Sequence, residues 1–275
     1  MPLRIVMLGD IVGRPGRLAV AQLLPVIRER YQPHLVLANA ENAANGSGLT
    51  PEHYRKLRAA GIDGITLGDH VYKKAQIIPT LKAERDIIRP ANLPPRAKGQ
   101  RWMCLPAGEE DAKRNVCVLT VLGRIFMNLP VNDPFETIDR VLAELPGPDP
   151  IVIVEVHAEA TSEKQAIGWR FNGRVAAVIG THTHVATADA RLLDQGTAYI
   201  TDIGMCGPQE SVLGRRVDRV LTYMTTAMPA PFDVAEGDPR VCGVLIEISD
   251  HSRHATDIER IELKADVNAP PFVAG

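Results

Sequence analysis

The sequence predicts an α/β fold with parallel strands, and three observations lead to that prediction. Short apolar runs alternate with amphipathic stretches over residues 1–90 of the 275-residue chain. The connections between them are short, as in parallel strands joined by right-handed helical crossovers. Several of the apolar runs end in a carboxylate, amide or imidazole side chain. Since open α/β sheets bind ligands at the carboxyl ends of their strands, we expect a functional site at that edge.

The first part of the chain predicts three strands and two helices. The helix expected over residues 17–31 has apolar residues at helical spacing, and Gly61 is a stop signal for the second helix. The expected strands span 3–8, 34–40 and 64–68, and the expected helices span 17–31 and 51–61.

The rest of the chain predicts a second series of strands. Two segments, 92–114 and 205–240, are rich in Gly, Pro and charge, and we expect them to be long loops. No stretch has the composition of a linker, so we expect a single domain over residues 1–275. The further strands are expected over 115–123, 150–157, 175–182 and 197–204, with a helix over 134–145 and a terminal hairpin over 241–263.

The composition is that of a folded globular protein with 45% hydrophobic residues and a formal net charge of -2. That charge excludes a strongly basic protein that binds nucleic acid or a membrane surface through its overall charge. The four cysteines include no C-x-x-C pair, and the N-terminus shows no secretory signal. We therefore expect a cytoplasmic protein with reduced thiols. The cysteines are Cys104, Cys117, Cys206 and Cys242.

The stretch VIGTHTHV at residues 178–185 shows most directly what the strand ends hold. Successive side chains of a strand point to opposite faces, so His182 and His184 share a face and Thr183 points away. Two imidazoles that converge at the end of a buried strand can hold a metal ion.

Four other predicted strands end in a similar way. A chance scatter of polar residues would not favour one end of the strands, so we interpret these groups as one site. The eight candidate residues are Asp10, Glu41, Asn42, Asp69, His70, His157, His182 and His184.

The chemistry of this set predicts divalent metal ions. Carboxylate, amide and imidazole ligands suit iron, manganese or zinc, and no thiolate is among them. This number of ligands is more than one tetrahedral ion can use. It fits a pair of ions that share a bridging carboxylate, and we choose Glu41 as that bridge.

Single motifs have simpler interpretations that the sequence leaves open. Asp10 alone is compatible with a helix N-cap, residues 41–48 with a plain turn, and His157 with a hydrogen-bonded core residue. Segment 158–169 fits either a lid over the site or a helix start capped by Ser162. Small residues such as Gly68 allow close approach of ligands but also form turns.

The motifs resemble those of the calcineurin-like metallophosphoesterases. GDIVGRPGR, AENAANGSGLT, HAEATSEK, GTHTHVATAD and YITDIGMCGP, spread over residues 8–208, resemble the YmdB-like bacterial branch in particular. The resemblance implies a four-layer α/β/β/α sandwich and a dinuclear centre, with iron first and manganese or zinc as alternatives. It also implies a homo-oligomer that hydrolyses phosphodiesters such as 2',3'-cyclic nucleotides.

The resemblance also implies a role for each site residue. A hydroxide held by the metal ions would attack phosphorus. His70 would be the catalytic histidine that protonates the leaving oxygen. By position, Asp10, Glu41, Asn42 and His184 would hold one ion, and Glu41, Asp69, His157 and His182 the other.

One residue departs from the family pattern. The family motif GNH is GDH here, with Asp69 in place of Asn. A carboxylate adds a negative charge and removes an N–H donor, which should weaken the attraction for an anionic substrate. The alternative function is therefore a metal-binding regulatory protein with weak or lost catalysis.

Other enzyme classes are excluded by missing motifs. The chain has no G-x-x-x-x-G-K-[ST] loop, no G-x-S-x-G elbow and no dinucleotide fingerprint. An amidohydrolase barrel has its H-x-H pair on the first strand, and too little chain follows His184 for the rest of such a barrel. Aromatic residues total only 4%, which favours a small phosphodiester substrate over a long single-stranded nucleic acid held by base stacking. RNA ends are a further substrate, and we expect no membrane partner.

Overall fold

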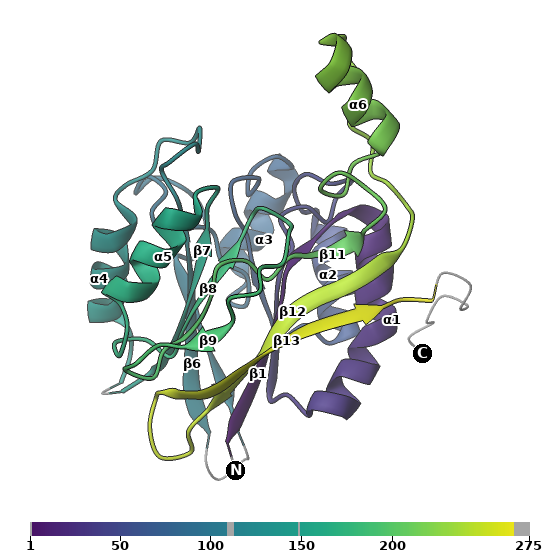
Figure 1. The fold of residues 1–275 in the computed structure, drawn as a ribbon. Helices are drawn as coiled ribbons and strands as arrows, with labels where there is room; N and C mark the ends of the chain where they lie inside the picture. Colours follow the sequence, from purple (N-terminus) through teal and green to yellow (C-terminus); the bar gives the residue numbers. More distant parts are fainter. Residues whose placement is uncertain (1, 109–112, 148, 267–275) are drawn as a thin grey trace.

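The computed structural model describes residues 2–108, 113–147 and 149–266, which form two β-sheets that face each other (Figure 1). The first sheet has the strand order β2-β11-β12-β1-β3-β4, with β13 beside β12, and the second has the order β5-β6-β7-β8-β10-β9. The strands of the first sheet are β1 Leu3–Leu8, β2 Asp10–Ile11, β3 Leu35–Asn39, β4 Gly64–Thr66, β11 Met205–Pro208, β12 Pro239–Ile248 and β13 Ala255–Lys264. Those of the second are β5 Trp102–Ala107, β6 Arg114–Leu122, β7 Ile151–His157, β8 Ala177–Thr181, β9 Arg191–Leu192 and β10 Ala198–Ile200.

Most of the helices cover the outer sides of the two sheets, whereas the helix Val217–Thr226 (α6) projects away from them (Figure 1). Helix α1 packs against β11 and β12, α4 against β6, and α5 against β8. The helices are α1 Gly13–Tyr31, α2 Pro51–Ala60, α3 Ile78–Ala83, α4 Pro134–Glu144, α5 Thr161–Arg170 and α6 Val217–Thr226, with a 3₁₀ turn η1 at Ala75–Ile77. None of the helices described is both long and apolar enough to cross a membrane.

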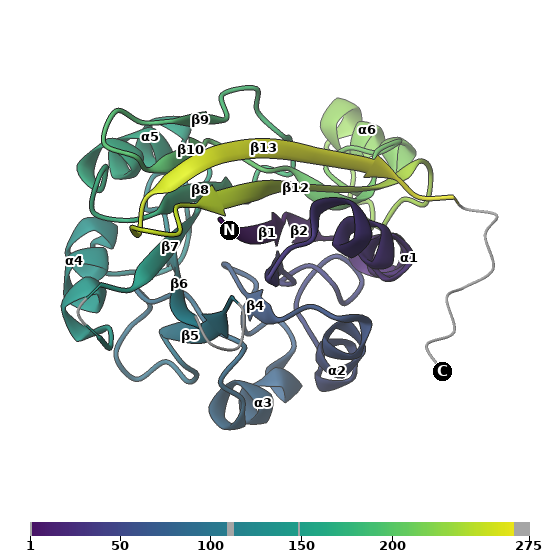
Figure 2. The ribbon, with the colours of Figure 1, turned by 90° about the horizontal axis from the view of Figure 1, so that it is seen from below.

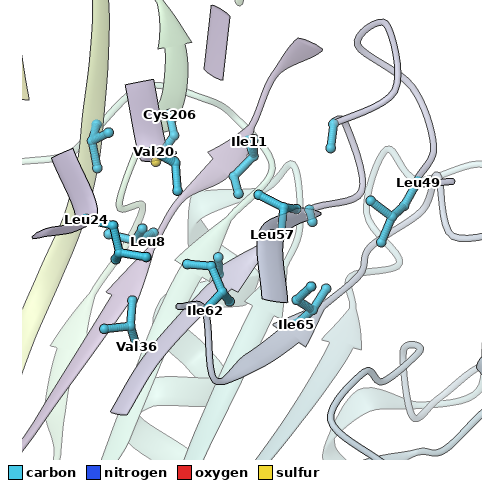
Figure 3. Packing of buried hydrophobic residues seen from close by; sticks show 14 of the residues in the cluster. Leu8, Ile11, Val20, Leu24, Val36, Leu49, Leu57, Ile62, Ile65 and Cys206 are labelled. Atoms are coloured by element: carbon cyan, nitrogen blue, oxygen red, sulfur yellow. The ribbon is translucent and has the colours of Figure 1, made fainter. Parts of the chain in front are cut away.

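Three apolar clusters fill the layers. One lies between the sheets, where Ile5 and Val244 of the first sheet meet residues such as Ile153 of the second. Another lies between the first sheet and its helices, where Leu24 of α1 packs near Leu8 and Val36 (Figure 3). The third lies between the second sheet and helices α4 and α5. Burial of this apolar surface is the main force that holds the layers together.

The predicted parallel strands are confirmed, and their register places the functional edge. Strands β1, β3 and β4 run parallel in the first sheet, and β6, β7, β8 and β10 in the second. His157 at the end of β7 is paired with Thr181 at the end of β8. The carboxyl ends of these strands therefore reach the same edge of their sheets.

The predicted terminal hairpin is also confirmed. Strands β12 and β13 pair antiparallel along their lengths, and β12 lies antiparallel beside β1. Figure 2 shows this hairpin running across one side of the molecule, with β13 close to β9 and β10. The last strands of the chain thus complete the first sheet and lie along the edge of the second.

The expectation that segments 92–114 and 205–240 are loops is wrong in part. Strand β5 lies in the first segment, and strand β11 and helix α6 lie in the second. Both strands are formed through distant partners, since β5 pairs with β6 and β11 pairs with β2 and β12. Local composition does not contain that information.

The expectation of four reduced cysteines is wrong for one pair. Cys104 and Cys117 lie directly opposite each other on the antiparallel strands β5 and β6 and form a disulfide. Their pairing depends on the strand register, which the wide sequence spacing conceals. The other two cysteines are free and buried, and burial raises the pKa of Cys242 to about 12.

Two helix starts differ from the simpler interpretations of the sequence. The N-cap of α1 is Val12, and Asp10 lies in β2, so Asp10 is not a helix cap. Segment 158–169 does contain a helix start, but its N-cap is Ala160 and Ser162 lies inside α5. Helix α5 is tied down by Glu163, whose carboxylate accepts hydrogen bonds from the backbone of Arg124.

Candidate metal centre

The structure brings the predicted site residues together from both sheets. The first sheet and the loops that follow its strands supply Asp10, Glu41, Asn42, Asp69 and His70. The second sheet supplies His157 at the end of β7 and the two histidines after β8. The backbone N–H of His182 donates to Asp10 Oδ2 at 3.1 Å, so the two halves are in direct contact here.

Four side chains converge on a common point. Ligand atoms of Glu41, Asp69, His157 and His182 all lie within 4.8 Å of one another. His157 Nε2 lies 3.0 Å from Asp69 Oδ1 and 3.3 Å from Glu41 Oε1. His182 Nδ1 lies 3.1 Å from His157 Nε2. This is the set implied by the resemblance for one of the two ions, and the chemistry of these donors fits a divalent cation.

A chain of buried hydrogen bonds sets the tautomer of His157. The hydroxyl of Thr181 donates to Glu155 Oε1 at 2.8 Å, and it therefore accepts from His157 Nδ1 at 2.9 Å. His157 Nε2 is the nitrogen that faces the carboxylates of the cluster, and it can give up its proton to ligate a cation. Glu155 is itself held by Asn39 and Thr120. Such outer hydrogen bonds orient metal-binding imidazoles and strengthen them as ligands.

The other two histidines are oriented in a related way. His184 Nδ1 donates to the backbone carbonyl of Leu213 at 3.0 Å, so Nε2 carries the lone pair, which faces the Asn42 amide nitrogen at 3.2 Å. Burial lowers the pKa of His184, which favours the neutral imidazole that a metal needs. His182 turns Nδ1 to the cluster and has Nε2 3.2 Å from Glu159 Oε2. All three imidazoles thus present a specific nitrogen.

The charge balance of the cluster favours ionised carboxylates around His157. Burial alone would raise the pKa of Glu41 and of Asp69, but the charge and hydrogen bonds of His157 outweigh it and lower both pKa values. In return, although burial opposes it, the pKa of His157 is raised well above its usual value by these carboxylates. The same negative charge attracts a cation to the position between them.

Asp10 shows most clearly that this site suits a cation. Its Oδ1 atom is buried and has no hydrogen-bond partner among the described residues. Burial, helped by the charges of Glu41 and Asp202, raises the pKa of Asp10 to about 7. A buried carboxylate oxygen without a partner is unfavourable, and coordination of a positive ion removes that cost.

Asn42 and His70 form a pair beside this cluster. His70 Nδ1 lies 2.6 Å from Asn42 Oδ1, and the backbone N–H of His70 donates to Glu41 Oε2 at 2.9 Å. Asn42 Nδ2 lies 3.2 Å from both Glu41 Oε1 and His184 Nε2. As placed, Asn42 turns its amide nitrogen towards the cluster, and it can ligate a cation only if the amide turns over and exchanges its oxygen and nitrogen.

Gly68 is needed for the close approach of these groups. A Cβ atom added to it would lie 2.3 Å from His157 Nε2 and 2.4 Å from Glu41 Oε2. No side chain larger than hydrogen fits there unless the cluster moves. The interpretation of Gly68 as a site of close approach therefore agrees with the structure.

The turn that carries His182 and His184 has an unusual backbone. Both residues have positive φ angles, 96° and 65°. Non-glycine residues rarely adopt this region, and clusters of them mark sites where the surroundings enforce the geometry. Asp202 supplies that restraint, since its Oδ2 accepts from the N–H of Thr183 at 3.1 Å and from its hydroxyl at 2.7 Å.

A buried lysine completes this support. Lys164 Nζ lies 2.8 Å from Asp202 Oδ2, and both side chains are almost fully buried. Asp202 Oδ1 accepts from the backbone of Gly204. The carboxylate thus joins α5 to the turn between the two histidines.

The sequence analysis missed these supporting residues. A signal did exist for Glu155, since a charged residue inside the apolar run VIVEVH shares the face of His157 two positions later. Lys164 and Asp202 lie 38 residues apart, and no local pattern pairs them.

Two facing sheets with carboxylates and imidazoles at the carboxyl ends of their strands define a calcineurin-like metallophosphoesterase. A solved 5'-nucleotidase from Candida albicans shares this fold at a TM-score of 0.55 and 11% identity, over 95% of this chain and 51% of that chain. The chain belongs to the YmdB-like protein family, whose model matches residues 6–261.

Closer relatives cover nearly the whole chain. A 2',3'-cyclic-nucleotide 2'-phosphodiesterase of Bacillus subtilis is 41% identical over 96% of this chain and 98% of its own length. The crystal structure of a hypothetical protein from Thermus thermophilus has a TM-score of 0.88 at 40% identity, covering 96% of this chain and 100% of that chain.

Proposed function

We propose that this protein is a metal-dependent phosphodiesterase that hydrolyses small phosphodiesters such as 2',3'-cyclic nucleotides. The observation that carries the proposal is the convergence of Glu41, Asp69, His157 and His182 within 4.8 Å. The similarity to the phosphodiesterase of Bacillus subtilis supports the substrate class.

The site residues divide into ligands and a proton donor. We assign Asp10, Glu41, Asn42 and His184 to one ion, and Glu41, Asp69, His157 and His182 to the other. Divalent ions bound there would lower the pKa of water and neutralise charge on the phosphoryl oxygens.

His70 is the residue suited to the leaving group. Its Nδ1 is held by Asn42 and its backbone by Glu41, and its Nε2, which lies 3.6 Å from Asp69 Oδ2, can hold the proton that the departing oxygen needs. In a 2',3'-cyclic substrate, water adds to phosphorus, the bond from phosphorus to O2' breaks, and O2' takes the proton.

Further parts of the proposal rest on the family resemblance and on single features. We propose one metallophosphoesterase domain over residues 1–275 with a four-layer α/β/β/α architecture. We propose iron as the first choice of metal, with manganese or zinc as alternatives. We also propose a cytoplasmic location for the protein and RNA ends as further substrates. We also propose a homo-oligomer. The projecting helix α6 supports it (Figure 1), since Val217, Leu221 and Met224 expose 43%, 52% and 71% of their surface.

Turnover by protein loaded separately with iron, manganese or zinc tests the proposal. We expect hydrolysis of bis-p-nitrophenyl phosphate and 2',3'-cyclic AMP, with two ions per chain. His182→Ala should lose one ion and lower turnover by more than about 100-fold, because a ligand of the cluster is removed. Two ions without turnover of either diester would instead support the regulatory alternative, and fewer than one ion would overturn the metal assignment.

Asp69 gives a second, smaller prediction. Asp69→Asn removes one negative charge from the cluster, so we expect kcat/KM for diesters to rise about 3- to 30-fold through stronger attraction of the anionic phosphate. Asp149→Asn is the matched control, since it makes the same change at an exposed carboxylate outside the cluster, paired with Arg253. A fall in kcat/KM for Asp69→Asn would show that the carboxylate is required here.

A further inference from the structure

A cavity adjoins the candidate metal centre at His184. Its volume is about 460 Å³, and His184 forms part of its wall. Pockets of this size hold small organic ligands. Since His184 belongs to both the cavity and the candidate metal centre, a ligand that fills the cavity lies next to any phosphate bound at the metals.

The walls of this cavity combine apolar and polar groups. Val185 and Leu213 present apolar surface beside His184 and are 59% and 48% exposed. Gln209 and Arg260 supply hydrogen-bonding groups from other elements. A flat ring with polar edges matches such walls better than an aliphatic or a purely charged ligand.

Gln209 carries the specific sign of a missing partner. Its Nε2 atom is buried, yet it has no hydrogen-bond partner among the described residues. A buried amide donor without an acceptor is unfavourable, and a ligand acceptor in the cavity would satisfy it. Every nucleobase offers ring-nitrogen or carbonyl acceptors at its edge.

We propose that this cavity is the nucleoside subsite of the enzyme, in which Gln209 and Arg260 contact the base. The proposal rests on the proposed function. In a 2',3'-cyclic nucleotide the phosphate is fused to the ribose, so the base must lie one sugar ring away from the phosphorus. Since His184 is shared, the cavity is a neighbour of the metal centre, where a group attached to the phosphate could enter it.

Comparison of a nucleotide with a substrate that has no base tests the subsite. For Gln209→Leu and Arg260→Met, we expect KM for 2',3'-cyclic AMP to rise about 3- to 10-fold, the value of a lost hydrogen bond. KM for bis-p-nitrophenyl phosphate should stay within twofold, because that diester has nothing to place in the cavity. Gln195→Leu, an exposed glutamine outside the cavity, is the matched control.

Two outcomes would overturn the proposal. One is an unchanged KM for 2',3'-cyclic AMP in both variants, and the other is an equal rise in KM for both substrates. If the wild-type protein hydrolyses neither diester, the proposed function fails, but calorimetric binding of 3'-AMP and of inorganic phosphate still tests the subsite. Weaker binding of 3'-AMP alone in the two variants supports it, and equal affinity in wild type and variants contradicts it.

Discussion

Gly68→Ala is expected to abolish metal binding at the cluster and to lower diesterase turnover by more than about 100-fold. The added methyl group would overlap His157 Nε2 and Glu41 Oε2, which belong to two of the four converging side chains. These side chains are fully buried and have no free space into which to retreat. Displacement of reacting groups by about 1 Å is enough for a 100-fold loss. Metal stoichiometry and turnover on the same sample measure both effects.

Gly237→Ala is the control for this prediction. Its added methyl group would also come within 3.0 Å of a side chain, that of the exposed Glu210, but at a position outside the metal cluster. We expect metal content and turnover of this variant to equal those of the wild type. If Gly68→Ala retained two ions and full turnover, the geometry of the cluster described above would be wrong.

Lys164→Met is expected to destabilise the protein by about 3–5 kcal/mol and to weaken metal binding. The substitution leaves Asp202 buried without its cation, and the loss of one partner of a buried ion pair has a cost of that size. Asp202 restrains the turn between His182 and His184, so its displacement should also cost metal affinity by about 10- to 100-fold. Denaturant unfolding measures the first effect and calorimetric Mn²⁺ titration the second.

Two further variants make this prediction specific. Lys56→Met breaks an exposed ion pair with Glu52, and we expect it to leave Mn²⁺ affinity unchanged. In Lys164→Met/Asp202→Asn the buried charge is removed along with its partner, so part of the lost stability should return. Mn²⁺ affinity at the wild-type level in folded Lys164→Met protein would contradict a role of the ion pair in positioning the histidines.

The parallel strands and the gathering of candidate ligands were predictable because both follow from short-range patterns. The carboxyl ends of parallel strands share an edge, and this gathers the candidate ligands. The expectation that strand alternation puts His182 and His184 on one face is wrong, because β8 ends at Thr181 and both histidines lie in the turn that follows, with positive φ angles. The structure brings Glu41 and His157 to that edge as the pattern predicts. The orientation of the Asn42 amide was not predictable, since it depends on His70 and His184 together.

The features that could not be predicted all depend on contacts between distant segments. The Cys104–Cys117 bond requires the register of β5 against β6. Lys164 and Asp202 meet only when α5 packs beside β8. Lysine is also rarely buried, so the usual burial preference predicts Lys164 at the surface, away from the buried Asp202 that it contacts.

The origin of the ligands in two sheets has a consequence for the folded state as a whole. Glu41 and Asp69 follow strands of the first sheet, whereas His157 and His182 come from the second. An ion bound by the proposed ligands would therefore act as a cross-link between the two halves of the molecule, at one end of the core that separates them. The free energy of ion binding would then add to the free energy of unfolding. In a cell short of the metal, the two halves of the protein would be less firmly joined.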